Sequence, residues 1–350
     1  MLIEPVPSFG GFLRAGQTFV KVLGVVWGLC AGTATWAAPQ AVILMYPPLV
    51  NEETTGPHIT VEQFETHLAE LTAGGYTLLP LADVTSALAA GADLPEKAVA
   101  VTFDEAHISF YRDAWPRLKA TGIPVTLFVT TAPVDQGAPG VMTWDQVREL
   151  RDVGVHIGHR GHSGKSLTRM SVTQAATDIE AASLRFEAEL GAIPSLFAYP
   201  EGDYDEALVE QIQKMGFKAA FAQYSSVATG DMLFALPRFA QSSSVAGLGR
   251  FRLVASALAL PVSGVVPEDP RLTANPPAFG FSLTATVPGL SALACYPSHL
   301  GGAADLTLLG DRRVEVRFEK PFPRGRSRIN CTMPGPKGRW YWFGRMFLVD

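Results

Sequence analysis

The feature that most constrains this sequence is a regular alternation, between about residues 41 and 260, of short apolar segments with longer amphipathic ones. Continuous apolar runs of this length are typical of strands buried on both faces, and the longer segments show helical spacing. The predicted strands cover residues 41–46, 98–103, 125–129, 155–158, 196–199 and 219–222, and the predicted helices cover residues 60–72, 109–120, 143–152, 171–190 and 205–215. This order predicts parallel strands joined by crossover helices.

Glycines stand where four of these predicted helices should end, at positions 122, 154, 191 and 216. Glycine is the usual residue just past a helix end because it adopts the left-handed backbone conformation without strain. Six such strand-and-helix units predict an α/β fold, a distorted or incomplete (β/α) barrel.

After about residue 265 the pattern changes to proline-rich segments followed by short alternating ones, such as residues 313–318 and 340–349. Alternation with period two predicts antiparallel strands. We therefore predict three parts: a signal peptide at 1–37, the barrel domain at 38–262 and a small β-rich C-terminal domain at 263–350. The aromatic and basic residues near 328–343 favour the core of that domain, with a sugar-binding face as the alternative.

The first forty residues resemble a secretory signal peptide. Arg14 and Lys21 precede an apolar run at residues 22–31, and small residues follow it. The run is shorter than the roughly twenty residues that a membrane span needs, although an uncleaved anchor is the alternative. We expect cleavage after Ala37 and a periplasmic or extracellular protein.

Three cysteines are present, and Cys30 would leave with the signal peptide. An exported chain with two remaining cysteines, Cys295 and Cys331, is expected to pair them, with two buried thiols as the alternative. The bridge would close a loop of about 37 residues and contribute roughly 3 to 4 kcal/mol.

Charge argues against a polyanionic partner. The chain has 28 basic and 33 acidic residues, a formal net charge of −5, and no block of one sign. Nucleic acid is therefore not expected, and nothing indicates an integral membrane partner; a ligand of low charge fits better.

Polar residues follow three of the predicted strands. Asp104, Glu105 and His107 come directly after residues 98–103, and His159 and His162 follow residues 155–158. The third group is a rigid turn, Pro200, Glu201 and Gly202, after residues 196–199. Because the carboxyl ends of barrel strands meet at one mouth, these groups should share a pocket with catalytic or metal-binding chemistry.

Six short segments together resemble the NodB homology domain of polysaccharide deacetylases. They are ILMY at 43–46, VTFD at 101–104, GIPVTLF at 122–128, IG at 157–158, FAYP at 197–200 and LPRF at 236–239. The resemblance implies metal-dependent hydrolysis of N-acetyl, or less often O-acetyl, groups on an acetylated polysaccharide or oligosaccharide. For an N-acetyl group the bond broken is a carbon–nitrogen bond other than a peptide bond, and the implied cofactor is zinc or a similar divalent metal.

The resemblance also implies residue roles. Asp104 matches the general base that takes a proton from metal-bound water, and backbone amides near Pro200, Glu201 and Gly202 would hold the oxyanion. Glu105 stands where the family has an aspartate ligand. Arg160 and Gly164 stand where it has two histidine ligands, and neither can replace an imidazole.

Two site architectures therefore stay open. Either Glu105, His107, His159 and His162 rebuild a metal site beside Asp104, or the usual metal site is lost. Against rebuilding, neighbours at a strand end point in opposite directions, so His159 should face away from where Arg160 points.

Three functions follow from these alternatives. The chain is an active hydrolase, a non-catalytic carbohydrate-binding relative of one, or a structural envelope protein. The remaining histidines, His58, His67 and His299, are expected at the surface or in loops.

Overall fold

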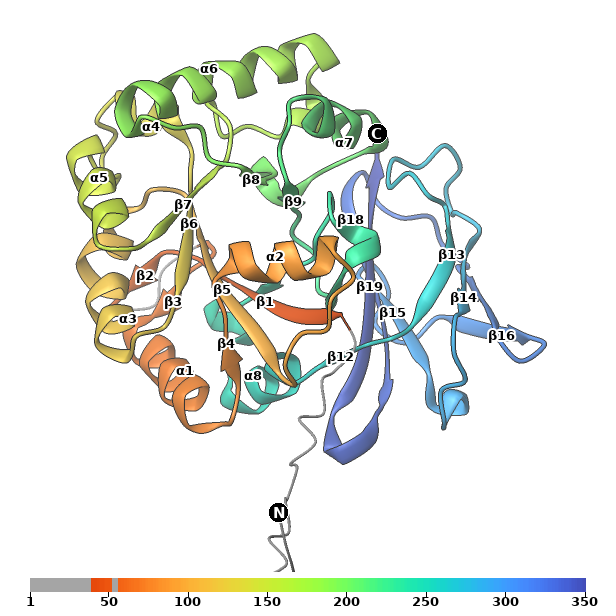
Figure 1. Cartoon of the computed structure of the whole chain (residues 1–350). Helices are drawn as coiled ribbons and strands as arrows, with labels where there is room; N and C mark the ends of the chain where they lie inside the picture. Colours follow the sequence, from red (N-terminus) through yellow and green to blue (C-terminus); the bar gives the residue numbers. More distant parts are fainter. Residues whose placement is uncertain (1–38, 52–55) are drawn as a thin grey trace, which may run out of the picture. The chain divides into compact units, whose positions relative to one another are not determined.

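The computed structural model describes residues 39–51 and 56–350, which belong to one compact unit (Figure 1). The predicted signal peptide, its cleavage site and Cys30 lie outside the described residues. Within the described ranges, no helix combines the length and apolar character needed to cross a membrane.

The main sheet has the order β10-β1-β5-β6-β7-β8-β9, parallel throughout except for the pairing of β10 with β1. Its strands are β1 (Gln40–Tyr46), β5 (Ala98–Asp104), β6 (Val125–Val129), β7 (His156–His159), β8 (Leu196–Ala198), β9 (Ala219–Phe221) and β10 (Ala228–Thr229), with β4 (Thr77–Leu78) beside β5. All six predicted parallel strands are confirmed. They were predictable because a central strand between two layers is apolar along its whole length.

The segment 236–240 joins β9, at one end of this sheet, to β1, which lies next to its other end. Leu236 forms a bridge to Phe221 of β9, and β11 (Phe239–Ala240) pairs parallel with β1. The sheet is thus a curved, incomplete barrel, as predicted, and residues 236–240 bring Arg238 beside the end of β5.

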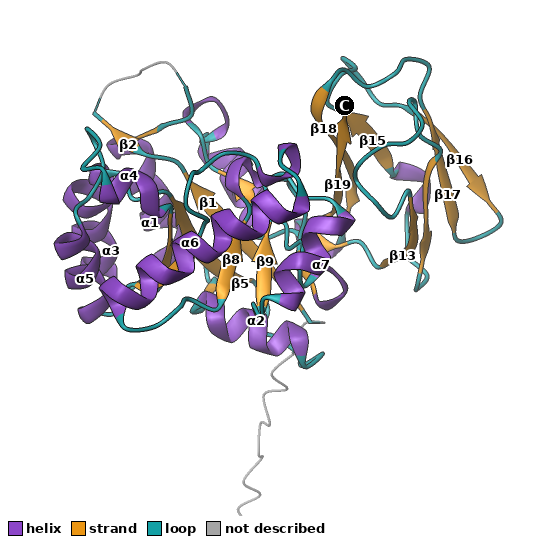
Figure 2. Ribbon diagram, turned by 90° about the horizontal axis from the view of Figure 1, so that it is seen from above, coloured by secondary structure: helices purple, strands orange, loops and turns teal. Residues whose placement is uncertain are grey.

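Helices surround these strands (Figure 2). They are α1 (Val61–Ala73), α2 (Leu81–Ala89), α3 (Trp115–Thr121) after a π-helical turn (Phe110–Ala114), α4 (Thr131–Asp135), α5 (Trp144–Asp152), α6 (Val172–Leu190), α7 (Glu206–Lys214) and α8 (Leu248–Ala255). Thr60, Thr143 and Ser171 begin α1, α5 and α6 with reciprocal capping boxes to a glutamine three residues on. The five predicted helices are confirmed; α2, α4 and α8 were not predicted.

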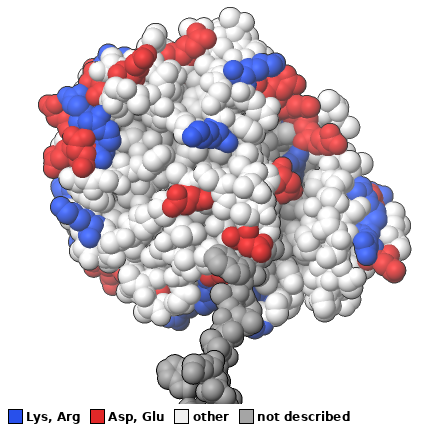
Figure 3. All heavy atoms as spheres, viewed as in Figure 1, with Lys and Arg blue, Asp and Glu red and all other residues white. Residues whose placement is uncertain are grey.

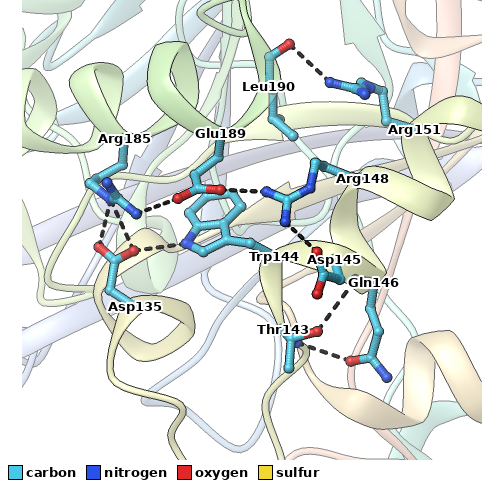
Figure 4. Close-up of polar contacts among 10 residues, drawn as sticks. All are labelled: Asp135, Thr143, Trp144, Asp145, Gln146, Arg148, Arg151, Arg185, Glu189 and Leu190. Carbon is cyan, nitrogen blue, oxygen red and sulfur yellow. Dashed lines mark hydrogen bonds and ion pairs between the residues drawn. The ribbon is translucent and has the colours of Figure 1, made fainter.

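A polar network joins α4, α5 and α6 (Figure 4). Asp135 accepts hydrogen bonds from Trp144 Nε1 at 2.7 Å and from Arg185 Nε at 2.9 Å. Glu189 bonds both Arg185 and Arg148. These side chains are partly exposed, so the network orients the helices more than it stabilises them. Over the face drawn in Figure 3, basic and acidic side chains are interspersed.

The prediction for His67 is wrong. This residue on α1 is fully buried, with Nε2 bonded to the Ala246 carbonyl at 2.7 Å and Nδ1 bonded to the Tyr46 hydroxyl at 3.2 Å. Its ring stacks on Phe251 of α8 at 3.9 Å between centroids. The unpredicted helix α8 supplies the surface that covers it. His58 is buried but lies in a loop, which the prediction allowed.

The C-terminal region forms two four-stranded sheets. One has the order β12 (Leu258–Ala259), β19 (Trp340–Val349), β18 (Gly325–Pro334), β15 (Ala294–Pro297); the other has the order β13 (Val262–Val266), β14 (Phe279–Leu283), β17 (Arg313–Arg317), β16 (Asp305–Leu309). Both strands predicted in this region are confirmed. Cys295 and Cys331 face each other on β15 and β18 and form the predicted disulfide. The boundary at residue 262 stays a prediction.

Candidate functional site

Asp104 ends β5 at the mouth of the barrel, and Arg238 holds its carboxylate. Arg238 Nη1 donates to Oδ1 at 2.5 Å and Nη2 donates to Oδ2 at 2.8 Å, while Gln223 Nε2 donates to Oδ2 at 3.2 Å. The Arg238 side chain has no exposed surface, and that of Asp104 is 10% exposed. A bidentate arginine and an amide therefore fix this carboxylate.

Arg160 is the second cation beside Asp104. It follows β7, and its side chain is only 5% exposed. Its Nε lies 3.5 Å from Asp104 Oδ2, and its Nη1 lies 3.6 Å from Glu105 Oε1. Nη1 also donates to Thr130 Oγ1 at 3.4 Å, whereas the buried Nε has no hydrogen-bond partner. Arg160 is thus close to two carboxylates without being well bonded to either.

These two arginines outweigh burial in setting the ionisation of Asp104. Burial would raise the pKa of the Asp104 carboxyl, but the charges of Arg238 and Arg160 and the hydrogen bonds from Arg238 and Gln223 bring the pKa below its usual value. Asp104 consequently stays ionised at neutral pH, and it is a weaker proton acceptor than an ordinary aspartate.

Glu105 lies at the solvent-exposed edge of this cluster. Its side chain is 59% exposed, and its backbone φ of 65° lies in the left-handed region, which glutamate seldom adopts. The longer glutamate therefore does not bury its carboxylate as the neighbouring Asp104 does.

The turn after β8 is built around Gly202. Its φ is 77°, and a Cβ there would lie 2.2 Å from Gln223 Cβ, so glycine is needed for Gln223 to approach and reach Asp104. Pro200 has no N–H, and the Gly202 N–H donates to the Tyr199 carbonyl at 2.8 Å. Glu201, with φ 57°, pairs with Arg169 at 3.6 Å. The backbone N–H groups of Pro200 and Gly202 therefore cannot hold an oxyanion in this arrangement, since the first does not exist and the second is already bonded. The oxyanion role of the rest of this turn stays a prediction.

His159 lies on the opposite side of its strand from Arg160. It is fully buried against Phe186, Phe197 and Phe217, and burial lowers its pKa to about 3. The Gly161 N–H donates to Nδ1 at 3.1 Å, and Nε2 lies 3.2 Å from Ser183 Oγ. Both ring nitrogens are therefore occupied within the protein.

The other two histidines also have local partners. His107 Nδ1 bonds Ser109 Oγ at 2.8 Å, and burial lowers the pKa of His107 although Glu105 opposes the shift. His162 Nδ1 bonds Thr131 Oγ1 at 2.8 Å. The alternative of a rebuilt metal site requires His107, His159 and His162 to converge beside Asp104. Among the described residues, these three imidazoles do not converge.

The residues at the family's ligand positions do not fit a divalent metal. A guanidinium fills the space beside Asp104, and Gly164 offers no donor atom. Within residues 39–51 and 56–350, no three His, Cys, Asp or Glu side chains converge as a metal site would require. The side chains at positions 160 and 164 therefore do not supply the two ligands that the family resemblance implies.

Comparison with known proteins agrees with the resemblance. Residues 91–220 match the family profile described as polysaccharide deacetylase. Residues 91–220 of this chain are therefore similar to the polysaccharide deacetylase domain.

Two curated relatives match this domain at low identity. The Bacillus subtilis protein YxkH, provisionally named a polysaccharide deacetylase, is 24% identical over 206 residues, which are 59% of this chain and 72% of that one. The poly-β-1,6-N-acetyl-D-glucosamine N-deacetylase of Escherichia coli K12 is 28% identical over 218 residues, covering 51% of this chain and 32% of that one. This chain thus matches about a third of the E. coli enzyme.

Solved structures show the same fold. The deacetylase PplD of Streptococcus pyogenes, in complex with acetate, aligns with a TM-score of 0.56 and 22% identity over 59% of this chain and 94% of that one. IcaB of Ammonifex degensii aligns with a TM-score of 0.55 and 23% identity over 62% and 97%. The deacetylase-domain fold is therefore shared across most of each of these two chains.

Sequence reasoning missed three residues that shape the site: Arg238, Gln223 and Thr130. Arg238 was in a segment that matched the family, but its partner Asp104 is 134 positions away. Gln223 is 119 positions from Asp104 and carries no recognisable local signal.

Proposed function

We propose that this protein is a polysaccharide deacetylase-like protein that binds an acetylated, exported polysaccharide without metal-dependent hydrolysis. The observation that carries the proposal is the buried Arg160 guanidinium, 3.5 Å from the Asp104 carboxylate. A permanent positive charge at that place repels a divalent cation, and arginine does not lose its proton in proteins.

The state of Asp104 supports the proposal as well. A general base needs a pKa near the working pH and a free oxygen aimed at the nucleophile. Here the Asp104 pKa is lowered, and Arg238 and Gln223 bond both carboxylate oxygens. Asp104 therefore serves as a structural anion at the centre of the mouth.

The ligand class comes from the relatives. The E. coli relative is named for poly-β-1,6-N-acetyl-D-glucosamine, and the S. pyogenes structure contains acetate. An acetylated amino-sugar polymer, neutral along its length, also suits a cluster in which two arginines balance two carboxylates. Export is part of the proposal, and it depends on the signal-like residues 1–37.

Hydrolysis is the second candidate function, because Asp104 and Glu105 keep two carboxylates at the end of β5. It would require acetate release by a route in which Arg160 moves away from Asp104, or in which no metal takes part.

One experiment separates the two functions. Purified mature protein is dialysed against zinc or cobalt, its metal content is measured, and it is incubated with an N-acetylglucosamine oligomer while binding and acetate release are followed. We expect oligomer binding, no stoichiometric metal and no acetate. Acetate release that disappears in Asp104→Asn would establish hydrolysis instead, and absence of oligomer binding by folded protein would refute the proposal.

A further inference from the structure

We propose that Arg160 is the group that recognises the acetyl substituent, by donating hydrogen bonds to its carbonyl oxygen. The inference rests on the proposed binding function and names the residue and the sugar substituent involved. Arginine at this place would thus hold the acetyl oxygen by charge-assisted hydrogen bonds.

Arg160 has donors that the protein does not satisfy. A guanidinium has five N–H donors, and buried donors are nearly always bonded. Arg160 Nε has no partner, and Nη1 makes only a long bond of 3.4 Å to Thr130 Oγ1. Its two carboxylate neighbours lie at 3.5 and 3.6 Å, beyond good hydrogen-bond distance. An oxygen acceptor arriving at the mouth would complete this set.

Asp104 does not satisfy Arg160 because its oxygens are bonded elsewhere. Arg238 donates to both Asp104 oxygens at 2.5 and 2.8 Å, and Gln223 adds a third bond. Arg238 also donates from Nε to the Ala222 carbonyl at 3.1 Å, so its fork is fixed. The best acceptor beside Arg160 is therefore already engaged.

The charge of the cluster favours a neutral ligand atom. Asp104 and Glu105 bring two negative charges and Arg160 and Arg238 bring two positive ones, so the cluster is balanced without a ligand. An added carboxylate would lie close to Asp104 and be repelled, whereas a neutral amide or ester carbonyl would not. The ligand atom is thus a neutral acetyl oxygen.

Gly164 lies beside Thr130, the residue that contacts Arg160. A Cβ at position 164 would lie 3.2 Å from Cγ2 of Thr130, the residue whose hydroxyl accepts from Arg160. A side chain at this position would press on Thr130. Glycine at position 164 therefore leaves the contact between Thr130 and Arg160 undisturbed.

The test compares binding of an N-acetylglucosamine oligomer with binding of the matching glucosamine oligomer, by calorimetry on the mature protein. We expect wild type to prefer the acetylated oligomer, and Arg160→Gln to weaken only that complex, by on the order of 10-fold or more. Arg160→Lys, which keeps the charge but loses the fork, should lie between them. Arg112→Gln, at an exposed arginine outside the site, is the matched control and should bind like wild type.

Competition with small molecules tests the preference for a neutral oxygen. Free N-acetylglucosamine should displace the oligomer, and sodium acetate should not. Displacement by acetate at lower concentration than by the neutral sugar would overturn the inference. Equal losses of affinity for both oligomers in Arg160→Gln would also overturn it, as would an unchanged preference for the acetylated oligomer in a folded variant. In either case, oligomer binding by wild type would still support the proposed function. If wild type binds neither oligomer, both proposals fail.

Discussion

Replacing Arg238 with methionine should destabilise the protein strongly, because it leaves a buried carboxylate without its bidentate partner. The Arg238 side chain is fully buried, and the Asp104 side chain is 10% exposed. Breaking a buried ion pair by removing one partner costs about 3 to 5 kcal/mol. Arg160 at 3.5 Å compensates only part of that charge, so we expect a loss near the lower end, about 3 kcal/mol.

The assay is urea unfolding of the mature protein at pH 7 and at pH 3, followed by circular dichroism. The folded-state pKa of Asp104 is lowered, so its contribution to stability is present above the unfolded pKa of about 3.9 and is lost as pH falls through the folded pKa. The difference between wild type and Arg238→Met should therefore be largest at pH 7 and smaller at pH 3.

A double-mutant cycle with Asp104→Asn isolates the pair, and the exposed pair Lys214 and Glu210 on α7 gives a control in which Lys214→Met should change little. A loss below about 1 kcal/mol at pH 7 would refute the reasoning for a costly buried pair. A loss that does not change with pH would refute the assignment to Asp104.

The altered site, the C-terminal disulfide and the buried His159 each give a further prediction. The triple variant Glu105→Asp, Arg160→His and Gly164→His should gain zinc or cobalt binding, seen by metal analysis and cobalt absorption. Aspartate and histidine tolerate the left-handed backbone at positions 105 and 164 better than most residues, and absence of bound metal in a folded variant would contradict this. Reducing the disulfide between β15 and β18 should lower the free energy of unfolding by roughly 3 to 4 kcal/mol, measured with and without reductant, and an unchanged midpoint would count against it. The folded pKa of His159 is about 3, so its contribution to stability should be complete above about pH 6.5 and should decline by about 1.4 kcal/mol per pH unit as the pH falls from 6.5 toward 3. A His159→Phe variant should lack this decline, and equal acid sensitivity of the two proteins would exclude it.

Much of the fold was predictable because its signals are local. Buried parallel strands are apolar along their length, and helix starts such as Thr60, Thr143 and Ser171 are followed by a glutamine at the capping-box position. The short helices α2 and α8 lacked such side-chain caps and were missed. The burial of His67 was missed for the same reason, since α8 supplies its stacking partner Phe251.

The candidate site was predictable only in part. Asp104 was placed correctly at a strand end, and strand alternation predicted that His159 and Arg160 face opposite ways. The aromatic pocket that holds His159 is assembled from α6, β8 and a loop, so it could not be foreseen from the histidine pattern.

The sequence by itself determined the alternating architecture and the substitutions at positions 105, 160 and 164, and it made a bond between the two cysteines outside the signal-like region the expected pairing. Each depends on residue type and short spacing. Only the tertiary structure decided which side chains surround Asp104, because its partners come from positions 160, 223 and 238 on separate loops. The link that residues 236–240 form between β9 and β1 brings these groups together, and the balance of charge within a few ångströms then sets what the site can bind.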